Sequence, residues 1–487
     1  MSTIDELKKV RLQKLKSIKD SGLLAYPAET KRTHSISEVL EDFSKLKKSE
    51  SEVVLAGRIM AMRGHGGATF LDIQSDGLKI QGLIKEDKVG ESGYKFLIDN
   101  FDIGDFIEVK GILIETKRGE KTVEAIDYKI LAKSLLPLPE KWHGLQDVEE
   151  RLRKRYLDIL FNPEVKQMIE KRSIFWNSMR SFLIKKGFLE VETPVLEVTT
   201  GGADAKPFIT HHNALDLDVY LRISTGELWQ KKLMVAGFEK TFEIGRQFRN
   251  EGMDAEHLQD YTQMEFYWAY ADYNMGMELV EEMYRYVIQE AFGTLKFKIK
   301  DFEVDFSKKW EKYDYWTIIN QYAKIDILKS SLSEMEKQLQ KLKIDYDKKG
   351  FNKTRAIDNL WKYCRKNLSG PGFLVNLPVD VSPLAKRDEK NEKVAQRFQV
   401  ILAGSEMGNG YSELNDPLDQ EERFKEQEKL RKAGDEEAQM FDHDFVEALE
   451  HGMPPTCGFG LSERLFSFLM DKPARETQIF PLMRPKT

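Results

Sequence analysis

Residues 248–252 read FRNEG, and the chain continues to TQMEF at residues 262–266. Phe242 and Ile244 alternate with polar residues before the first motif, and the second motif alternates in the same way. This pattern predicts a strand, a loop and a second strand. Arg249 then lies where the first strand gives way to the loop, a place where an arginine could hold a phosphate group.

A second stretch, GFGLSERL at residues 458–465, carries another arginine in a comparable place. Its two glycines allow close backbone approach within a strand-like run. Leu461, Leu465 and Leu469 then recur with helical spacing, which places Arg464 in the opening helical turn. A guanidinium at the start of a helix predicts a phosphate site.

Length and composition narrow the class of protein. A chain of 487 residues is too long for one ordinary core, so we expect two or three domains. Cys364 and Cys457 have no CxxC partner, which excludes a disulfide framework and a cysteine-based zinc site. Residues 1–19 hold no apolar run long enough for a signal or a membrane span, which predicts a cytoplasmic protein without membrane attachment.

The net charge of −6 argues against nonspecific coating of nucleic acid, but it permits local basic patches. One such patch is predicted on an amphipathic N-terminal helix, either as a solvated face or as a contact for RNA. Its basic residues are Lys8, Lys9, Arg11, Lys14, Lys16 and Lys19.

Five short alternating runs predict a small barrel, with the OB-fold as the expected type. The runs lie at residues 53–60, 69–73, 78–83, 106–113 and 123–131. Pro137 and Pro139 make the next segment stiff and extended, so we place a domain boundary there. The predicted organisation is a helical segment at 1–50, a barrel at 51–136, a linker at 137–160 and a catalytic domain at 161–487.

The catalytic domain is expected to begin with a long helix, because Asn162 and Pro163 form a good helix start and Gly187 a good end. An extended strand should follow the glycine. Phe175 and Trp176 lie on the apolar face of this helix, either exposed to a partner subunit or packed within one subunit. The lysine-rich residues 300–370 predict a helical connecting insertion.

The FRNEG and GFGLSERL stretches resemble motifs 2 and 3 of the class II aminoacyl-tRNA synthetases. The long helix and the strand after it resemble motif 1, the dimer-forming element of that class. The chain is most similar to bacterial lysyl-tRNA synthetases, through GGA at 201–203, PFITHHN at 207–213, YWAYADY at 267–273 and EMGNGYSELND at 406–416.

This resemblance implies an α+β fold in which an OB-fold β-barrel precedes an antiparallel β-sheet flanked by helices. It also implies a homodimeric ligase that activates L-lysine with ATP and Mg²⁺ and transfers the lysyl group to the 3′ end of tRNA(Lys).

For ATP, the resemblance assigns binding to Arg249, Glu251, His257, Tyr261 and Arg464. Arg249 would hold the α-phosphate and the amino acid's carboxylate, and Arg464 would pack against adenine and reach the γ-phosphate. Both would be catalytic, because two anions that react with each other need cationic clamps. Glu251 would read the adenine amino group, Tyr261 would stack on adenine, and His257 would contact the phosphate tail.

For lysine, the resemblance assigns binding to Gly202, Glu227, Arg249, Glu265, Tyr267, Asn409 and Glu413. Glu413, with Tyr267 as its hydrogen-bond partner, would receive the ε-ammonium group, and Glu227 would receive the α-ammonium group. A buried ammonium group must meet a carboxylate, because desolvation is otherwise too costly. Ornithine, one methylene shorter, is the competitor that is hardest to reject.

The chain departs from the family pattern at several positions, among them 225–226 and 258–260, and two of the departures change charge. By resemblance Glu406 would bind Mg²⁺, but the second expected carboxylate, seven residues earlier, is the neutral Gln399. An amide oxygen carries no charge, so the number or affinity of bound metal ions should differ from that of relatives. Glu256 stands where the family usually carries an arginine near the phosphates, so the motif 2 loop is less basic than expected.

In the barrel, the resemblance assigns the anticodon to Arg58, Phe70 and Gln81. Three other functions stay open: a paralogue that attaches a lysine-like amino acid to a protein such as elongation factor P, an aspartyl or asparaginyl enzyme, and a non-catalytic RNA-binding or regulatory protein. The barrel disfavours the first, and the carboxylates Glu227 and Glu413 would repel the acidic substrate of the second. Gln399 and Glu256 keep the third open. The retained motif residues argue against it, namely Arg249, Glu251, His257, Glu406 and Arg464.

Overall fold

The structure is a computed structural model, and it describes residues 3–139, 147–203, 205–252, 254–348, 351–433 and 438–486. The chain forms two units, Met1–Val165 and Lys166–Thr487. Residues 140–146 of the predicted linker lie outside the described residues, and the predicted domain limits remain predictions.

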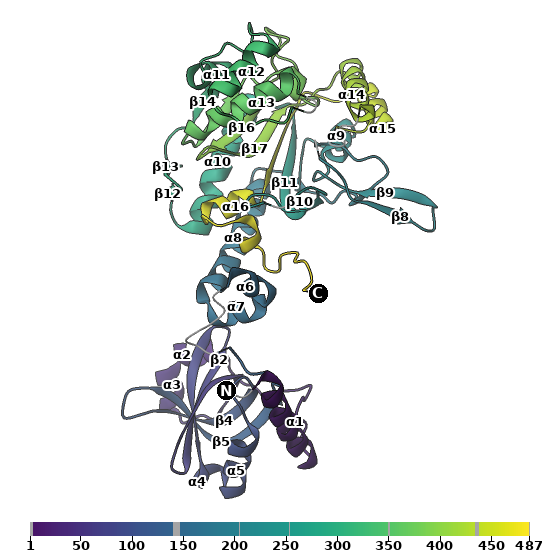
Figure 1. The fold of residues 1–487 in the computed structure, drawn as a ribbon. Coiled ribbons are helices and arrows are strands. Elements are labelled where there is room, and N and C mark those ends of the chain that lie inside the picture. Colours follow the sequence, from purple (N-terminus) through teal and green to yellow (C-terminus); the bar gives the residue numbers. More distant parts are fainter. Residues whose placement is uncertain are drawn as a thin grey trace. The chain divides into compact units, whose positions relative to one another are not determined.

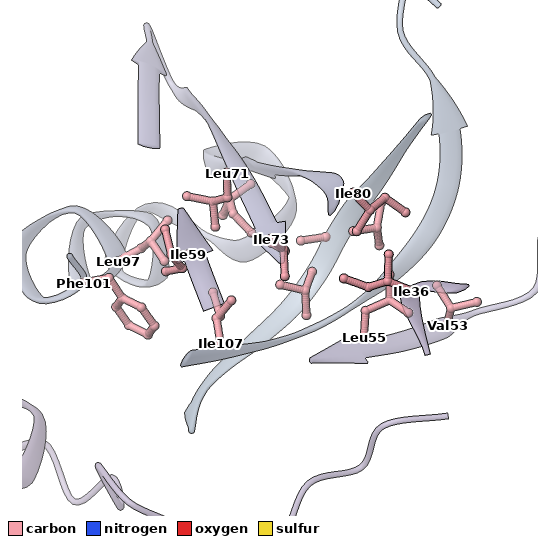
Figure 2. Close-up of a cluster of buried hydrophobic side chains, with 14 of the residues drawn as sticks. Ile36, Val53, Leu55, Ile59, Leu71, Ile73, Ile80, Leu97, Phe101 and Ile107 are labelled. Carbon is pink, nitrogen blue, oxygen red and sulfur yellow. The ribbon is translucent and has the colours of Figure 1, made fainter. Parts of the chain in front are cut away.

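The first unit contains a closed five-stranded barrel, which confirms the predicted architecture (Figure 1). The strands are β1 (Val53–His65), β2 (Ala68–Ser75), β3 (Leu78–Lys85), β4 (Phe106–Glu115) and β5 (Lys121–Ala132). They neighbour one another in the order β1-β2-β3-β5-β4, and only the β3–β5 pair is parallel. Figure 2 shows the inward residues of alternating positions, such as Leu55, Ile73 and Ile107, packed into one core.

Short helices accompany the barrel: α1 (Ile4–Asp20), α2 (Ile36–Glu41), α3 (Phe43–Lys48), α4 (Glu86–Val89) and α5 (Glu91–Asn100), followed by α6 (Val148–Arg153) and α7 (Arg155–Phe161). In α1, Arg11 is only 8% exposed and donates hydrogen bonds to the carbonyls of Ile103, Ser134 and Leu136 at 3.0–3.1 Å. Lys14 forms an ion pair with Asp102 at 2.8 Å. The predicted basic patch is therefore smaller than the sequence suggested, because these two cations fasten the helix to the barrel.

An eight-stranded sheet forms the centre of the second unit, in the order β14-β15-β16-β17-β18-β11-β10-β6. Only the outermost pairs, β14–β15 and β10–β6, are parallel. The strands are β6 (Leu189–Glu190), β10 (Lys240–Phe248), β11 (Asp260–Ala269), β14 (Glu311–Asp314), β15 (Gly372–Val375), β16 (Arg397–Leu402), β17 (Ser405–Ser412) and β18 (Thr456–Ser462). The strand, loop and strand predicted around FRNEG are thus confirmed as β10 and β11.

One face of this sheet packs against α10 (Tyr273–Phe292) and α16 (Arg464–Leu469), and α8 (Pro163–Lys185) packs against α16. Phe266, Phe398 and Phe459 form the aromatic layer beneath them. Phe175 is fully buried and Trp176 is 9% exposed, so the aromatic face of α8 packs within the subunit. Of the two alternatives, packing within one subunit is therefore the one observed, with Phe466 of α16 against Phe175 and Phe175 against Trp176.

The connecting insertion is helical, with α11 (Tyr315–Ala323), α12 (Leu332–Lys341) and α13 (Lys353–Cys364) around one apolar cluster. That cluster also contains Leu374 and Ile401 of the main sheet, so the helices lie against the β15–β16 end of it (Figure 1). The predicted range 300–370 also contains two strands, β13 (Phe302–Asp305) and β14.

The remaining elements are the hairpin β12 (Lys296–Ile299) and β13 (Phe302–Asp305), the small sheet β7 (Leu196–Glu197), β9 (Leu217–Leu221) and β8 (Ile209–His212), and the helices α9 (Glu227–Val235), α14 (Pro417–Lys432) and α15 (His443–Glu450). Among the described residues, no helix has both the length and the apolar content needed to cross a bilayer. The cytoplasmic location stays a prediction.

Candidate active site

A cavity of about 500 Å³ opens on the sheet face opposite the aromatic layer. Strand alternation creates it: in β11, Met264 and Phe266 point to the helices, whereas Gln263, Glu265 and Tyr267 line the cavity. All thirteen residues predicted for the catalytic domain line this one cavity, namely Gly202, Glu227, Arg249, Glu251, His257, Tyr261, Glu265, Tyr267, Gln399, Glu406, Asn409, Glu413 and Arg464.

Glycine keeps the cavity open in β18. A Cβ atom on Gly458 would lie 2.1 Å from Oε1 of Glu413 and 2.7 Å from the Tyr267 ring. A side chain there would displace both groups, so the close approach of the strand to its neighbours requires glycine.

Three charged side chains meet at the end of the cavity that is predicted to bind the amino acid, called the amino-acid end below, and each is at most 5% exposed. Lys231 donates a hydrogen bond from Nζ to Oε1 of Glu227 at 2.8 Å, and it forms an ion pair with Oε2 of Glu413 at 2.5 Å. Glu227 begins α9 and Lys231 follows one turn later, so the helix presents both groups to the same space. The Tyr411 hydroxyl also donates to Glu227.

Glu265 is a third buried carboxylate of this end, 3% exposed. It accepts hydrogen bonds from the Thr225 backbone N–H at 2.7 Å, from Gln263 at 2.5 Å and from the Tyr267 hydroxyl at 3.0 Å. The prediction that Tyr267 is the hydrogen-bond partner of Glu413 is therefore wrong for this structure, because Glu265, on the same strand face two residues away, takes the hydroxyl.

Charge in this end is not balanced. Burial, reinforced by Glu227, raises the pKa of Glu265 to about 7. Burial also raises the pKa of Glu413 well above its usual range, although Lys231 opposes the shift. Burial alone would lower the pKa of Lys231, but the attraction of Glu227 and Glu413 raises it. Three carboxylates against one ammonium group leave a place that favours additional positive charge.

Arg249 lies at the other, nucleotide end, directly after β10. Its Nε donates to the carbonyl of Ile223 at 3.2 Å, and its guanidinium lies 5.8 Å from the centre of the Tyr261 ring. No carboxylate of the described residues forms an ion pair with it. Arg249 is thus a guanidinium with free donors facing the cavity.

Arg464, the first residue of α16 as predicted, is already paired. Its Nη2 binds the Glu256 carboxylate, its Nη1 donates to the carbonyl of Glu406 at 3.3 Å, and Lys300 reaches Glu256 at 3.6 Å. Burial would raise the pKa of Glu256, but Arg464 lowers it below the usual range, so the carboxylate is charged. The departure at Glu256 therefore has a direct consequence: the Glu256 carboxylate is bound to Arg464, the residue predicted to contact the γ-phosphate.

Glu406, the predicted metal ligand, is surrounded by hydrogen-bond donors. Oε1 accepts from Nε1 of Trp361 at 2.7 Å and lies 3.0 Å from Nη1 of Arg365, while Oε2 accepts from Nε2 of Gln399 at 3.2 Å. No group of three or more metal-ligating side chains occurs in the described part of the chain. One carboxylate, already paired with a guanidinium, does not fit a protein-held Mg²⁺ ion, which needs free oxygen ligands.

Several side chains that pair with residues lining this cavity were absent from the sequence predictions. Lys231 could have been found, because it lies four residues after Glu227 on an expected helix, a spacing that brings two side chains together. Trp361 and Arg365 gave no such signal. They lie more than 40 residues from Glu406 in the sequence and reach it only through the packing of α13.

The three predicted anticodon residues lie on outward-facing positions of neighbouring strands in the barrel. Phe70 is half-buried, and Gln81 lies opposite Asp72 across the β2–β3 pair. Gln81 accepts a hydrogen bond from Thr122 at 3.0 Å. The Arg58 guanidinium stacks on Phe106 at 4.2 Å and donates to the carbonyl of Gly104 at 3.1 Å, so part of its donor capacity is used within the barrel.

Comparisons with known proteins cover the whole chain. A family model described as tRNA synthetases class II (D, K and N) matches residues 147–484, and one described as an OB-fold nucleic acid binding domain matches residues 53–135. Proteins named lysine--tRNA ligase are among the relatives. Those of Thermosipho africanus, Pelotomaculum thermopropionicum and Thermotoga maritima are 42%, 45% and 40% identical, over 99% of this chain and 97%, 96% and 97% of the relative.

Proposed function

The chain belongs to the class II tRNA synthetases of the aspartate, lysine and asparagine group, and on that premise we propose that it joins L-lysine to tRNA(Lys). In the first step a carboxylate oxygen of lysine bonds to the α-phosphorus of ATP, and pyrophosphate leaves. In the second step a hydroxyl of the terminal ribose attacks the lysyl-adenylate, and AMP leaves. The observation that carries the choice of lysine is the charge of the buried amino-acid end.

Free lysine brings two ammonium groups and one carboxylate at neutral pH. When ionised, Glu227, Glu265 and Glu413 exceed the charge of Lys231 by two, so the two ammonium groups of the substrate neutralise the site. The carboxylate of lysine would meet Arg249, whose donors are free. Aspartate would add negative charge to this end, and asparagine would leave one excess carboxylate without a partner.

Nucleotide binding at the other end would rest on Arg249 and Arg464, the two cations of motifs 2 and 3. Glu251, Tyr261 and His257 complete the proposed ATP site, and Gly202 and Asn409 complete the proposed lysine site. His257 is held by Asp254, with Nδ1 2.8 Å from the carboxylate. We keep Mg²⁺ in the proposal as the ion that accompanies ATP, since phosphate oxygens are its preferred ligands, and not as an ion that Glu406 and Gln399 hold.

The barrel would bind the anticodon of tRNA(Lys) through Arg58, Phe70 and Gln81. A half-buried phenylalanine beside polar groups suits base stacking, and loss of one stacking ring costs about 1–3 kcal/mol in such sites. Phe70→Ala should therefore leave adenylate formation intact and weaken tRNA charging about 10-fold or more. Equal loss of both activities would reject this division of labour.

We also propose a homodimer. Apolar side chains that are 41–67% exposed gather on α8, β6 and the small sheet of β7, β8 and β9, a surface suited to a partner. They are Ile174, Ile184, Leu189, Val195, Leu196, Val198, Ile209 and Leu215. A Leu196→Asp/Ile209→Asp protein should sediment as a monomer in an ultracentrifuge; an unchanged dimer would place the interface elsewhere.

A second candidate function has its own observation. Glu256 pairs with Arg464 and Arg365 pairs with Glu406, so the nucleotide end is partly neutralised by the chain itself. A non-catalytic RNA-binding protein would show the same feature.

Exchange of pyrophosphate into ATP, measured without tRNA for every standard amino acid plus ornithine and β-lysine, separates the two functions. Exchange with lysine alone supports the synthetase. A folded protein that exchanges with none of them at ample Mg²⁺ would instead be the non-catalytic protein.

A further inference from the structure

Glu406 has two partners at the end of a helix outside the main sheet, Trp361 and Arg365. It lies at the start of β17, paired with Ile401 of β16, at the end of the sheet that the connecting helices cover. Trp361 comes from the last turn of α13, and Arg365 follows directly after that helix. Both reach the same oxygen, Oε1, at 2.7 and 3.0 Å.

The other oxygen of Glu406 is also engaged. Gln399 donates from Nε2 at 3.2 Å, so the amide presents a donor to the carboxylate rather than a second anionic ligand. The three side chains sum to zero charge: Glu406 contributes −1, Arg365 contributes +1 and Gln399 contributes none. A site with a carboxylate at both positions and no arginine would carry −2.

A divalent cation would bind only weakly to Glu406, Arg365 and Gln399, because together they carry no net charge. Mg²⁺ binds oxygens at about 2.0–2.1 Å and requires near-octahedral geometry. An ion on Oε1 would lie close to the Arg365 guanidinium, and like charges at short range repel each other strongly in a partly buried site. An ion on Oε2 would have to displace the N–H group of Gln399.

We infer that Arg365 takes the place of a protein-bound divalent cation beside Glu406, so that the only metal ions in the ATP complex are those that the nucleotide carries. The inference rests on the proposed function, because it concerns the ATP complex of the same cavity. Arg365 is a positioning residue: it neutralises and orients Glu406, whose backbone carbonyl accepts a hydrogen bond from Arg464 at 3.3 Å. Through that contact the pair also fixes the guanidinium predicted to reach the phosphates.

The test counts metal ions rather than activity. Mn²⁺ is titrated into the full-length protein with saturating lysine and a non-hydrolysable ATP analogue, and free Mn²⁺ is measured by electron paramagnetic resonance. Four proteins are compared: the wild type, Arg365→Gln, Gln399→Glu and the double variant. Glutamine at position 365 keeps donors for Glu406 while it removes the charge.

The double variant should bind one more Mn²⁺ per active site than the wild type, or hold its weakest ion at least about 10-fold more tightly. Each single variant should fall between them. Equal number and affinity in the wild type and the double variant would overturn the inference. Arg355→Ala, which removes an exposed arginine of α13 far from this contact, should match the wild type.

A second measurement separates a wrong role for Arg365 from a wrong function for the whole protein. Calorimetry of the same samples reports whether the ATP analogue binds at all. Binding of the analogue with unchanged metal counts rejects only the role of Arg365. If the folded wild-type protein does not bind the ATP analogue at all, both the synthetase function and the inference about Arg365 are rejected.

Discussion

The two ends of the active-site cavity treat charge in opposite ways. At the amino-acid end, Glu227, Glu265 and Glu413 share one buried ammonium group, Lys231, and the pKa values of Glu265 and Glu413 are raised, so protons offset part of the excess negative charge in the empty site. At the nucleotide end, Arg464 is paired with Glu256, and Glu406 is paired with Arg365. The first end is prepared for a ligand that brings positive charge, whereas the second must exchange internal partners for those of its ligand.

Burial explains why the imbalance persists at one end only. The charged groups of the amino-acid end are 1–5% exposed, so water does not screen them. The side chains of Glu256 and Arg464 are 32% and 20% exposed, so their pairing is weaker and reversible. Selectivity for the amino acid should therefore be rigid, and affinity for the nucleotide should be adjustable by single substitutions.

The largest effect is expected from Glu413→Gln. The amide keeps the shape of the side chain but leaves the incoming ammonium group without its charge partner, and loss of one partner of a buried pair costs about 3–5 kcal/mol. kcat/KM for lysine in pyrophosphate exchange should fall at least about 100-fold, mainly through KM. Glu450→Gln, at the exposed end of α15, is the matched control and should change nothing. A loss below 10-fold would show that the amino-acid end does not depend on this carboxylate.

Arg249→Ala should come next. Among the described residues no carboxylate pairs with Arg249, and removal of a preorganised donor to developing charge costs about 10²–10³ in rate. kcat for adenylate formation should fall by that factor in single-turnover assays, with a smaller change in the affinity for lysine. Arg246→Ala, an exposed arginine three residues earlier that pairs with Asp260, is the control. An equal loss in both variants would indicate damage to the loop instead.

The pH dependence of lysine binding tests the imbalance directly. The pKa of Glu265 is about 7 in the folded protein against 4.5 ordinarily, so the empty site holds a proton that the ammonium groups must expel. The affinity for lysine should rise as the pH increases towards 7, by up to about 10-fold per pH unit, and level off above it. Calorimetry in buffers of different ionisation enthalpy should detect the released proton.

Glu265→Gln should reduce that proton release, leaving only what Glu413, whose pKa is also raised, contributes. Release unchanged in this variant would assign the proton to another group. The raised pKa of Glu265 also makes the stability of the fold depend on pH, in the opposite direction to lysine affinity. Because the folded chain retains a proton that the unfolded chain has lost, the contribution of Glu265 to stability is present below pH 4.5 and declines as the pH rises to about 7.

The smallest expected effect is a gain at the nucleotide end. Glu256→Gln removes the internal anion on Arg464, and a pair of this exposure is worth at most about 1 kcal/mol. KM for ATP should fall by up to about fivefold, and the gain should shrink at high salt. Glu303→Gln, exposed in β13, is the control. An increase in KM would mean that Glu256 assists the nucleotide rather than competing with it.

Much of the secondary structure could be predicted from the local pattern of apolar and polar residues. Alternation with a period of two predicted the barrel strands and β10 and β11, and Pro163 and Gly187 marked the limits of the helix that became α8. The same local signals did not decide between a partner subunit and internal packing for Phe175 and Trp176, because an apolar helical face does not reveal what covers it. In this protein Phe466, almost 300 residues later, packs against that face.

In the candidate site too, some features were predictable from the sequence and others were not. The residues quoted with the family motifs, from Gly202 to Arg464, do line one cavity. The partners of those residues were not predictable: Tyr267 binds Glu265 instead of Glu413, and Lys231 fills the space between two carboxylates. Pairing depends on angles and distances of a few tenths of an ångström, which a motif does not encode.

The sequence by itself determined the family, the order of the domains and the set of side chains available for chemistry, because these follow from residue type, spacing and resemblance. Only the tertiary structure decided the charge of each end of the cavity. Electrostatic balance depends on which buried groups lie within a few ångströms of one another, and packing brings Arg365 to Glu406 and Glu256 to Arg464 across 41 and 208 residues of chain.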